Sequence, residues 1–157
     1  MSKIKCQASG FSLLEVLIVI AILSVLAVAG AGFYRSFIKS AEIGLVAKNI
    51  ISDLKDARAK SMVGENGLKW GVHFINGNED YYEIFSTPAD YSSASTTIDE
   101  TDYLPGAIYF TSPANLSSST VIFGKINGTT TATTTIGISS SEEEVKTITI
   151  TPIGTIY

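Results

Sequence analysis

A single carboxylate, Glu15, lies near the start of an almost unbroken apolar run that covers residues 11–34. A charged side chain at the centre of a bilayer costs about 2.5 kcal/mol or more. Acidic residues inside membrane-length segments are rare for that reason, and they usually have a function. Glu15 is therefore the residue whose type and position most strongly indicate a chemical role.

The residues before the run complete a pattern. The leader MSKIKCQASG carries Lys3 and Lys5 and no acid, and it ends with Gly10 directly before Phe11. This segment resembles the N-terminus of type IV pilins and type II secretion pseudopilins, which have a short basic leader, Gly, Phe, a Glu and a long apolar helix. The resemblance implies that a membrane prepilin peptidase cuts between Gly10 and Phe11 and methylates the new N-terminus. Glycine suits such a cut because its backbone can extend and approach a protease closely.

The resemblance also gives Glu15 a partner. Residue 11 is one helical turn from Glu15, so the amine created at Phe11 is within reach in the same chain. In a filament, Glu15 of an incoming subunit could instead meet the amine of the subunit already in place. A mis-registered pair would leave a buried charge unpaired, at roughly 3–5 kcal/mol, so the contact would fix the axial register. The alternative is that Glu15 lies at headgroup depth and has no role.

Two other targeting signals remain open. In an ordinary secretory signal the cleavage site follows the apolar region, and Ala27-Val28-Ala29 fits such a site. A plain signal anchor fits the length of the run but does not explain Glu15.

The run is long enough to span a bilayer. Val16 to Tyr34 provides about 19 uncharged residues, close to the number that a hydrocarbon core requires. Lys3 and Lys5 favour a cytoplasmic N-terminus. The sequence thus predicts a single-pass plasma (inner) membrane protein whose later residues lie outside the cytoplasm. Assembly would carry it to a filament or the cell surface.

The elements that follow predict an α+β fold. A helical pattern without proline continues from Arg35 to about Met62, and residues 64–67 end it. Its apolar positions follow i, i+3, i+4 spacing: Ile43, Val46, Ala47, Ile50, Leu54 and Ala57. We expect a long N-terminal helix, half membrane-embedded and half amphipathic, packed on a C-terminal antiparallel β-sheet domain. The predicted boundaries are 1–10 for the cleaved leader, 11–34 for the transmembrane and filament-core helix, 35–64 for the amphipathic helix and 65–157 for the β-rich domain.

Alternating apolar residues and turn signals predict the strands. Trp70, Val72 and Phe74 form one face of the first, and Asn76-Gly77 is a turn signal before the second. The other predicted strands are Tyr81–Phe85, Ala107–Phe110, Thr120–Ile126, Thr131–Ile138, Val145–Thr151 and a short one within Ile153–Tyr157. Thr87–Asp102 and Ser112–Ser119 are rich in Ser, Thr and acids, and we expect them to be loops.

Composition excludes some functions. The 157 residues carry a net charge of −4, and removal of residues 1–10 leaves 9 basic and 15 acidic residues, a net of −6. Without a cluster of Lys or Arg there is no direct signal for nucleic-acid binding. The single cysteine, Cys6, lies in the leader, so the mature domain would have no disulfide and its stability would come from packing.

Enzyme chemistry has little support. His73 is the only histidine, and it faces away from Trp70, Val72 and Phe74 on the predicted strand. The nucleophile elbow G-x-S-x-G is absent. A lone histidine without a mature cysteine argues against a zinc site. We therefore expect no enzyme activity, no catalytic residue, no metal and no cofactor.

A weaker resemblance covers the rest of the chain. Residues 45–62, Lys69-Trp70-Gly71-Val72, Val121-Ile122-Phe123, Ile136-Gly137-Ile138 and the closing Gly154 are similar in spacing to the GspH/FimT class of minor pilins and pseudopilins. This implies a minor structural subunit of a type IV pilus or type II secretion system. Its partners would be other pilin or pseudopilin subunits, the prepilin peptidase and an inner-membrane assembly platform. The alternatives are a major pilin, or a signal-anchored extracytoplasmic binding or enzymatic domain that never assembles.

Overall fold

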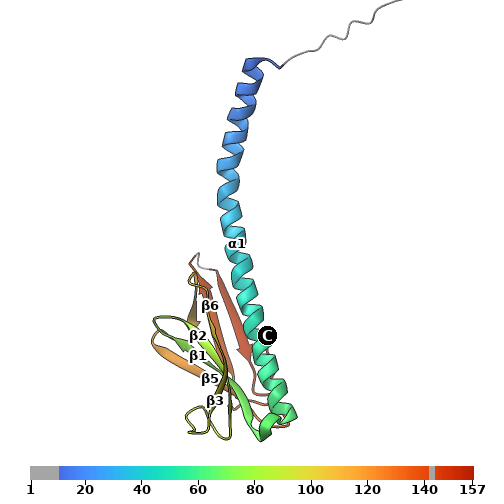
Figure 1. Cartoon of the computed structure of the whole chain (residues 1–157), viewed down its shortest axis with the longest axis vertical. Helices are drawn as coiled ribbons and strands as arrows, with labels where there is room; N and C mark the ends of the chain where they lie inside the picture. Colours follow the sequence, from blue (N-terminus) through green and yellow to red (C-terminus); the bar gives the residue numbers. More distant parts are fainter. Residues whose placement is uncertain (1–10, 142–143) are drawn as a thin grey trace, which may run out of the picture. The chain divides into compact units, whose positions relative to one another are not determined.

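The computed structural model describes residues 11–141 and 144–157, and for residues 29–34 it describes the backbone. The chain begins with a long helix, α1 (Leu13–Val63), and a short 3-10 helix, η1 (Glu65–Gly67), followed by β-strands (Figure 1). It divides into two compact units, one ending at Ile38 and the other running from Lys39 to Tyr157.

The first unit is the apolar part of α1. From Phe11 to Val28 every described side chain is exposed, although nearly all of them are apolar. Within the described residues, no helix combines the length and the hydropathy needed to cross a membrane.

The second part of α1 is amphipathic, as its spacing predicts. Ile43, Ile50 and Leu54 are fully buried, while Lys48, Asn49 and Ser52 between them are exposed. The helix ends at Val63, and Gly64 follows with φ of 71°. Glycine takes this left-handed conformation readily because it has no Cβ, so it ends a helix at little cost. The predicted helix end, close to Met62, is thus confirmed within one residue.

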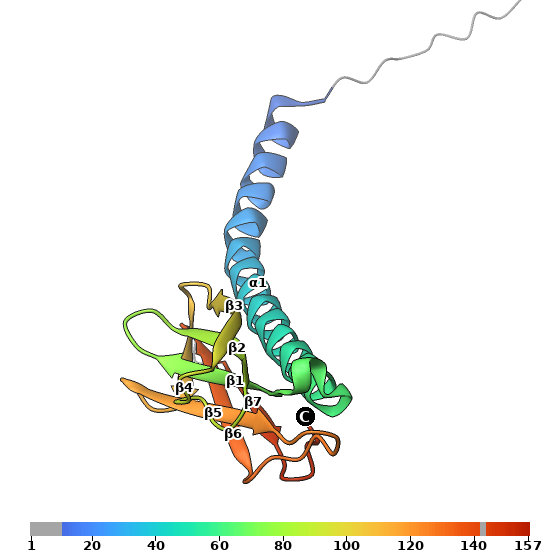
Figure 2. The ribbon, with the colours of Figure 1, turned by 60° about the horizontal axis from the view of Figure 1, so that its bottom comes forward.

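Seven strands follow in the described residues: β1 (Lys69–Asn76), β2 (Tyr81–Thr87), β3 (Thr97–Tyr103), β4 (Ile108–Ser112), β5 (Ser117–Phe123), β6 (Thr134–Ser140) and β7 (Val145–Ile150). They form two antiparallel sheets, with orders β3-β2-β1-β5 and β4-β6-β7. Figure 2 shows both sheets beside the C-terminal half of α1. A bridge between Ile150 and Ile156 adds the predicted terminal segment to the edge of β7.

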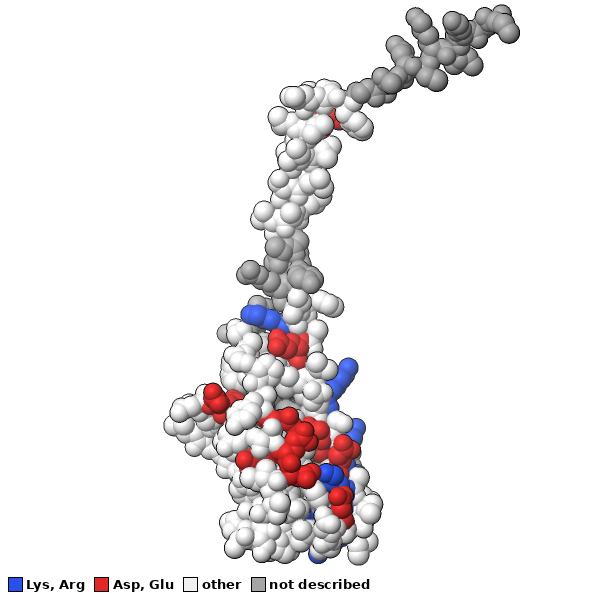
Figure 3. Space-filling view, in the orientation of Figure 1, with Lys and Arg blue, Asp and Glu red and all other residues white. Residues whose placement is uncertain are grey.

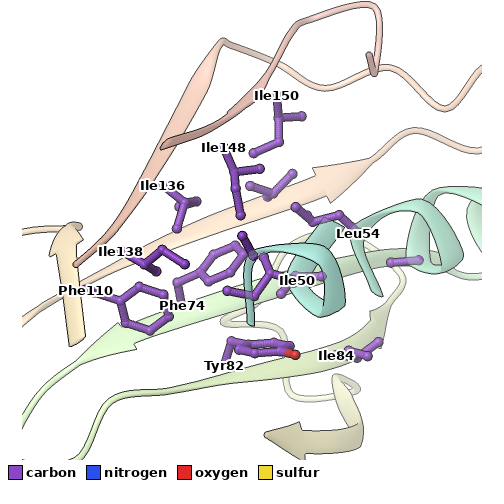
Figure 4. Close-up of a cluster of buried hydrophobic side chains, with 14 of the residues drawn as sticks. Ile50, Leu54, Phe74, Tyr82, Ile84, Phe110, Ile136, Ile138, Ile148 and Ile150 are labelled. Atoms are coloured by element: carbon purple, nitrogen blue, oxygen red, sulfur yellow. The ribbon is translucent and has the colours of Figure 1, made fainter. Parts of the chain in front are cut away.

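The core lies between these sheets and the helix. Ile50 and Leu54 from α1 point toward Phe74 of β1 and toward Ile148 and Ile150 of β7 (Figure 4). Burying one such side chain contributes about 1.5–3 kcal/mol relative to leaving it exposed. The α+β fold, with a helix packed on an antiparallel β-sheet domain, is confirmed.

The predicted loop Thr87–Asp102 is wrong in its second half, because β3 occupies Thr97–Tyr103. This strand is an edge strand, and nearly all of its side chains are exposed. An exposed edge strand shows no apolar alternation, and its charges protect the edge from pairing with other chains. Its backbone pairs with β2, which carries the apolar pattern. The residues of β3 itself therefore have no pattern that predicts a strand.

Three other boundaries need correction. β5 begins at Ser117, inside the predicted loop Ser112–Ser119, because Ser117 to Ser119 pair with β1. It ends at Phe123, before the predicted Ile126, since the chain turns there and Ile126 has φ of 70°. Residues 131–133 are not part of β6, which begins at Thr134.

Candidate functional site

The predicted assembly site lies at the start of α1. The Ser12 carbonyl oxygen accepts hydrogen bonds from the backbone N–H groups of Glu15 (3.0 Å) and Val16 (3.2 Å), and these bonds begin the helix. Glu15 therefore lies in the first turn, where the positive end of the helix dipole favours a negative side chain. Phe11 precedes the first helical residue and is 81% exposed. Gly10, the other half of the predicted cleavage site, lies outside the described residues.

Glu15 differs from the other polar groups of this segment. The Ser24 hydroxyl donates to the Ile20 carbonyl oxygen at 2.8 Å, so it is satisfied by its own helix. No hydrogen bond or ion pair to the Glu15 carboxylate occurs within the described residues. A carboxylate surrounded by apolar side chains has a strong preference for a cationic partner. Residues 11–34 contain no other charged side chain, so the predicted partner is the amine that cleavage creates at Phe11, either in the same chain or in a neighbouring subunit.

A second cluster lies on the outer face of the sheet, around His73. The Tyr91 ring stacks on the imidazole with a centroid distance of 3.8 Å, and the Tyr91 hydroxyl donates to Glu83 Oε2 at 2.6 Å. His73 Nδ1 lies 2.7 Å from Thr120 Oγ1. Burial lowers the pKa of His73, and the nearby Glu83 carboxylate offsets part of this effect. Burial and the hydrogen bond to Glu83 raise the pKa of Tyr91 to about 12.

This cluster does not have the geometry of a catalytic triad. In a triad the carboxylate bonds to the imidazole and orients it. Here the Glu83 carboxylate accepts from Tyr91, and the imidazole contacts the Thr120 hydroxyl through Nδ1. The contacts fix the segment between β2 and β3 onto the sheet, which is a structural role. His73 faces away from Trp70, Val72 and Phe74 as predicted, but Tyr91 covers it, and no local pattern indicates this contact because Tyr91 lies in a loop beyond the next strand.

Acidic side chains gather on one face of the unit formed by residues 39–157 (Figure 3). Asp53 of α1 accepts a hydrogen bond of 2.6 Å from the Tyr82 hydroxyl. Burial raises the pKa of Asp53, although the bond from Tyr82 acts against this, and nearby Asp102 and Asp56 add to the rise. Burial and Asp53 also raise the pKa of Tyr82. Among the described residues, no group of His, Cys, Asp or Glu is placed to hold a metal ion.

The comparisons with known proteins concern the N-terminal segment. The family model for the prokaryotic N-terminal methylation motif matches residues 5–31. No curated protein and no solved structure matches the chain. The motif supports a type IV pilin-like, prepilin-type protein that is anchored in a membrane. It implies processing by a prepilin peptidase and assembly with other pilin subunits.

Proposed function

We propose that this protein is a structural subunit, and not an enzyme, of a type IV filament system. The observation that carries the proposal is the coincidence of the methylation motif at residues 5–31 with Glu15 as the sole charge of residues 11–34. A helix that is apolar all round needs lipid or other apolar surface around it. The bilayer would provide that surface before assembly, and the helices of neighbouring subunits would provide it afterwards.

The proposed precursor crosses the plasma (inner) membrane once. Lys3 and Lys5 keep its N-terminus in the cytoplasm, because positive charge next to a span favours that side. The β-domain then lies outside the cytoplasm. The prepilin peptidase cuts between Gly10 and Phe11 and methylates the Phe11 amine. An inner-membrane assembly platform moves the mature subunit into the filament, and the β-domain comes to its surface.

In this proposal Glu15 sets the position of each subunit along the filament. Its carboxylate meets the N-terminal amine of the subunit already in place. A shifted subunit would leave both charges buried and unpaired, which costs roughly 3–5 kcal/mol. The Glu15 carboxylate makes no hydrogen bond or ion pair within the described residues, so it is available for this contact.

We further propose that the protein is a minor subunit of the GspH/FimT class, in either a type IV pilus or a type II secretion system. Two features support this rank. The mature chain has no cysteine for the C-terminal disulfide loop that some major pilins carry, and the spacing of its strand residues resembles that class. Quantitative proteomics of sheared filaments tests the rank. The protein should be far less abundant than the main subunit, whereas a dominant band would identify a major pilin.

The function is tested by replacing Glu15 with alanine. Glu15→Ala should still be cleaved and should still reside in the membrane, since the cut and the apolar run are unchanged. It should be lost from filaments when it competes with an equal amount of the native subunit. Ser24→Ala is the matched control in the same helix, because the Ser24 hydroxyl is satisfied internally and its loss should leave incorporation unchanged.

Two results would oppose the proposal. Native-level incorporation of Glu15→Ala would refute the register role and favour a carboxylate that merely lies at headgroup depth. A cleaved or uncleaved native protein that never enters filaments would favour a signal-anchored extracytoplasmic domain.

A further inference from the structure

A cavity of about 910 Å³ opens on the β-domain. It lies between the β1–β2 turn, the connection from β3 to β4, and β4 itself, all within residues 76–115. This volume falls within the range of small-molecule binding sites. Nothing in the proposed assembly of the helix uses this cavity.

Hydrogen bonds hold the wall of the cavity in place. Asp80 accepts from the Gly77 N–H at 3.1 Å and from the Phe110 N–H at 2.6 Å. The Asn76 amide, in a side chain that is 6% exposed, donates to the carbonyl oxygens of Phe110 and Pro113, both at 2.8 Å. These bonds join the β1–β2 turn to β4. The wall is therefore fixed before any ligand arrives, which lowers the entropic cost of binding.

The rim offers aromatic surface. Tyr103 is 62% exposed and Tyr109 is 47% exposed, and both line the cavity. The Tyr103 ring is supported by Tyr81, with ring centroids 5.2 Å apart. Exposed tyrosines present an apolar ring and a polar hydroxyl, and they lose little conformational entropy on binding.

The rim also offers polar groups of a particular kind. Asn78, Glu79 and Asn115 line the cavity. Within the part of the chain that the structure describes, their side chains make no hydrogen bond or ion pair, so these groups face solvent. An amide both donates and accepts, whereas a carboxylate accepts several bonds. Such groups are complementary to a ligand with adjacent hydroxyls, because each hydroxyl donates one hydrogen bond and accepts others.

The charge of the lining restricts the ligand. Its charged residues are Glu79 and Asp80, and it contains no Lys or Arg. Two carboxylates repel phosphates, uronates and sialic acids. We propose that the cavity binds a neutral oligosaccharide, whose ring C–H faces pack on Tyr103 and Tyr109 and whose hydroxyls bond to Asn78, Glu79 and Asn115. This inference does not depend on the proposed filament function, because every residue involved lies in the β-domain.

The test uses the full chain in a detergent without a sugar headgroup, since an alkyl glycoside would compete for the cavity. Saturation-transfer NMR and calorimetry are run with maltotriose, cellotriose and triacetylchitotriose as neutral probes, and with sialyllactose as the anionic probe. At least one neutral probe should bind saturably and more tightly than sialyllactose.

Variants connect the binding to the cavity. Tyr109→Ala should weaken the neutral probe at least about tenfold, the loss of one good stacking contact. Tyr157→Ala is the matched control, because Tyr157 is 65% exposed and does not line the cavity. Glu79→Gln keeps acceptor groups and removes one charge, so it should retain the neutral probe and improve the affinity for sialyllactose.

The proposal is overturned if no neutral probe binds saturably. It is also overturned if Tyr109→Ala binds as tightly as the native chain, or if sialyllactose binds the native chain as tightly as the neutral probes. Circular dichroism of each variant shows that it is folded. Glu79 is exposed at a turn, so Glu79→Gln preserves the fold and keeps the charge test decisive.

Discussion

Replacing Tyr91 with alanine should uncover His73 and release the segment between β2 and β3. The Tyr91 ring stacks on His73 and meets Phe85 edge-on at 4.9 Å, and its hydroxyl bonds to Glu83. Each aromatic pair contributes about 0.5–1.5 kcal/mol. The bond to the carboxylate adds about 1.5 kcal/mol in this partly exposed setting. We expect Tyr91→Ala to lower the free energy of unfolding by about 2.5–4.5 kcal/mol.

The same substitution should change the titration of His73. Burial holds the pKa of His73 below its ordinary value, and Tyr91 provides much of that cover. Without the ring, the pKa should rise toward about 6.5. His73 is the only histidine, so its imidazole proton signal in NMR spectra needs no assignment. Tyr91→Phe is the matched control, because it keeps the stacked ring and should shift the pKa less.

The pH dependence of stability follows from the sign of this shift. Below about pH 6.5 the unfolded chain binds a proton at His73 that the native chain resists. The free energy of unfolding should therefore fall as the pH drops from that value through the native pKa of His73. In Tyr91→Ala, the free energy of unfolding should no longer fall in this way as the pH drops. An unchanged His73 titration in Tyr91→Ala would refute the assignment of Tyr91 as the cover of His73.

Four further substitutions, one of them a control, test the domain by denaturant unfolding. Gly154 has φ of 79°, and a Cβ added there would collide with backbone, whereas Gly106 faces open space. Gly154→Ala should therefore cost at least about 2 kcal/mol, and Gly106→Ala under about 0.5 kcal/mol. Ile126 is a β-branched residue at φ of 70° and is 81% exposed, so it is strained and packs little. Ile126→Gly should stabilise the domain by about 1 kcal/mol, because glycine adopts this conformation without strain. Asp53→Asn should be more stable than the native chain at neutral pH, because burial raises the pKa of Asp53 and so penalises its charged form. The difference should vanish when acid protonates Asp53. If Asp53→Asn and the native chain were equally stable across the pH range, burial of the charged Asp53 carboxylate would not destabilise the native chain.

Local sequence patterns predict much of the fold. The spacing of Ile43, Ile50 and Leu54 predicts the buried stripe of α1, and the alternation of Trp70, Val72 and Phe74 predicts the core face of β1. These elements bury one regular face, so their periodicity is visible along the chain. β3 is the opposite case, because its stability comes from pairing with β2 and not from apolar side chains of its own.

The candidate sites also differ in how far the sequence predicts them. Glu15 is recognisable because a charge inside an apolar run is locally unusual. The cavity of the β-domain is not recognisable, because Asn76 and Phe110 are distant in sequence and are joined through the placement of β4 beside the β1–β2 turn. Likewise, nothing local marks Tyr91 as the cover of His73. Contacts made by tertiary packing leave little trace in short stretches of sequence.

The mass of the N-terminal peptide of the mature protein shows whether the chain is processed as a prepilin. Protein isolated from membranes of cells with an active prepilin peptidase is digested and analysed by mass spectrometry. We expect a mature chain that begins with Phe11 and carries a methyl group on its amine. The same preparation from cells without the peptidase should retain residues 1–10. An intact N-terminus in both preparations, or a mature chain that begins after Ala29, would refute processing as a prepilin.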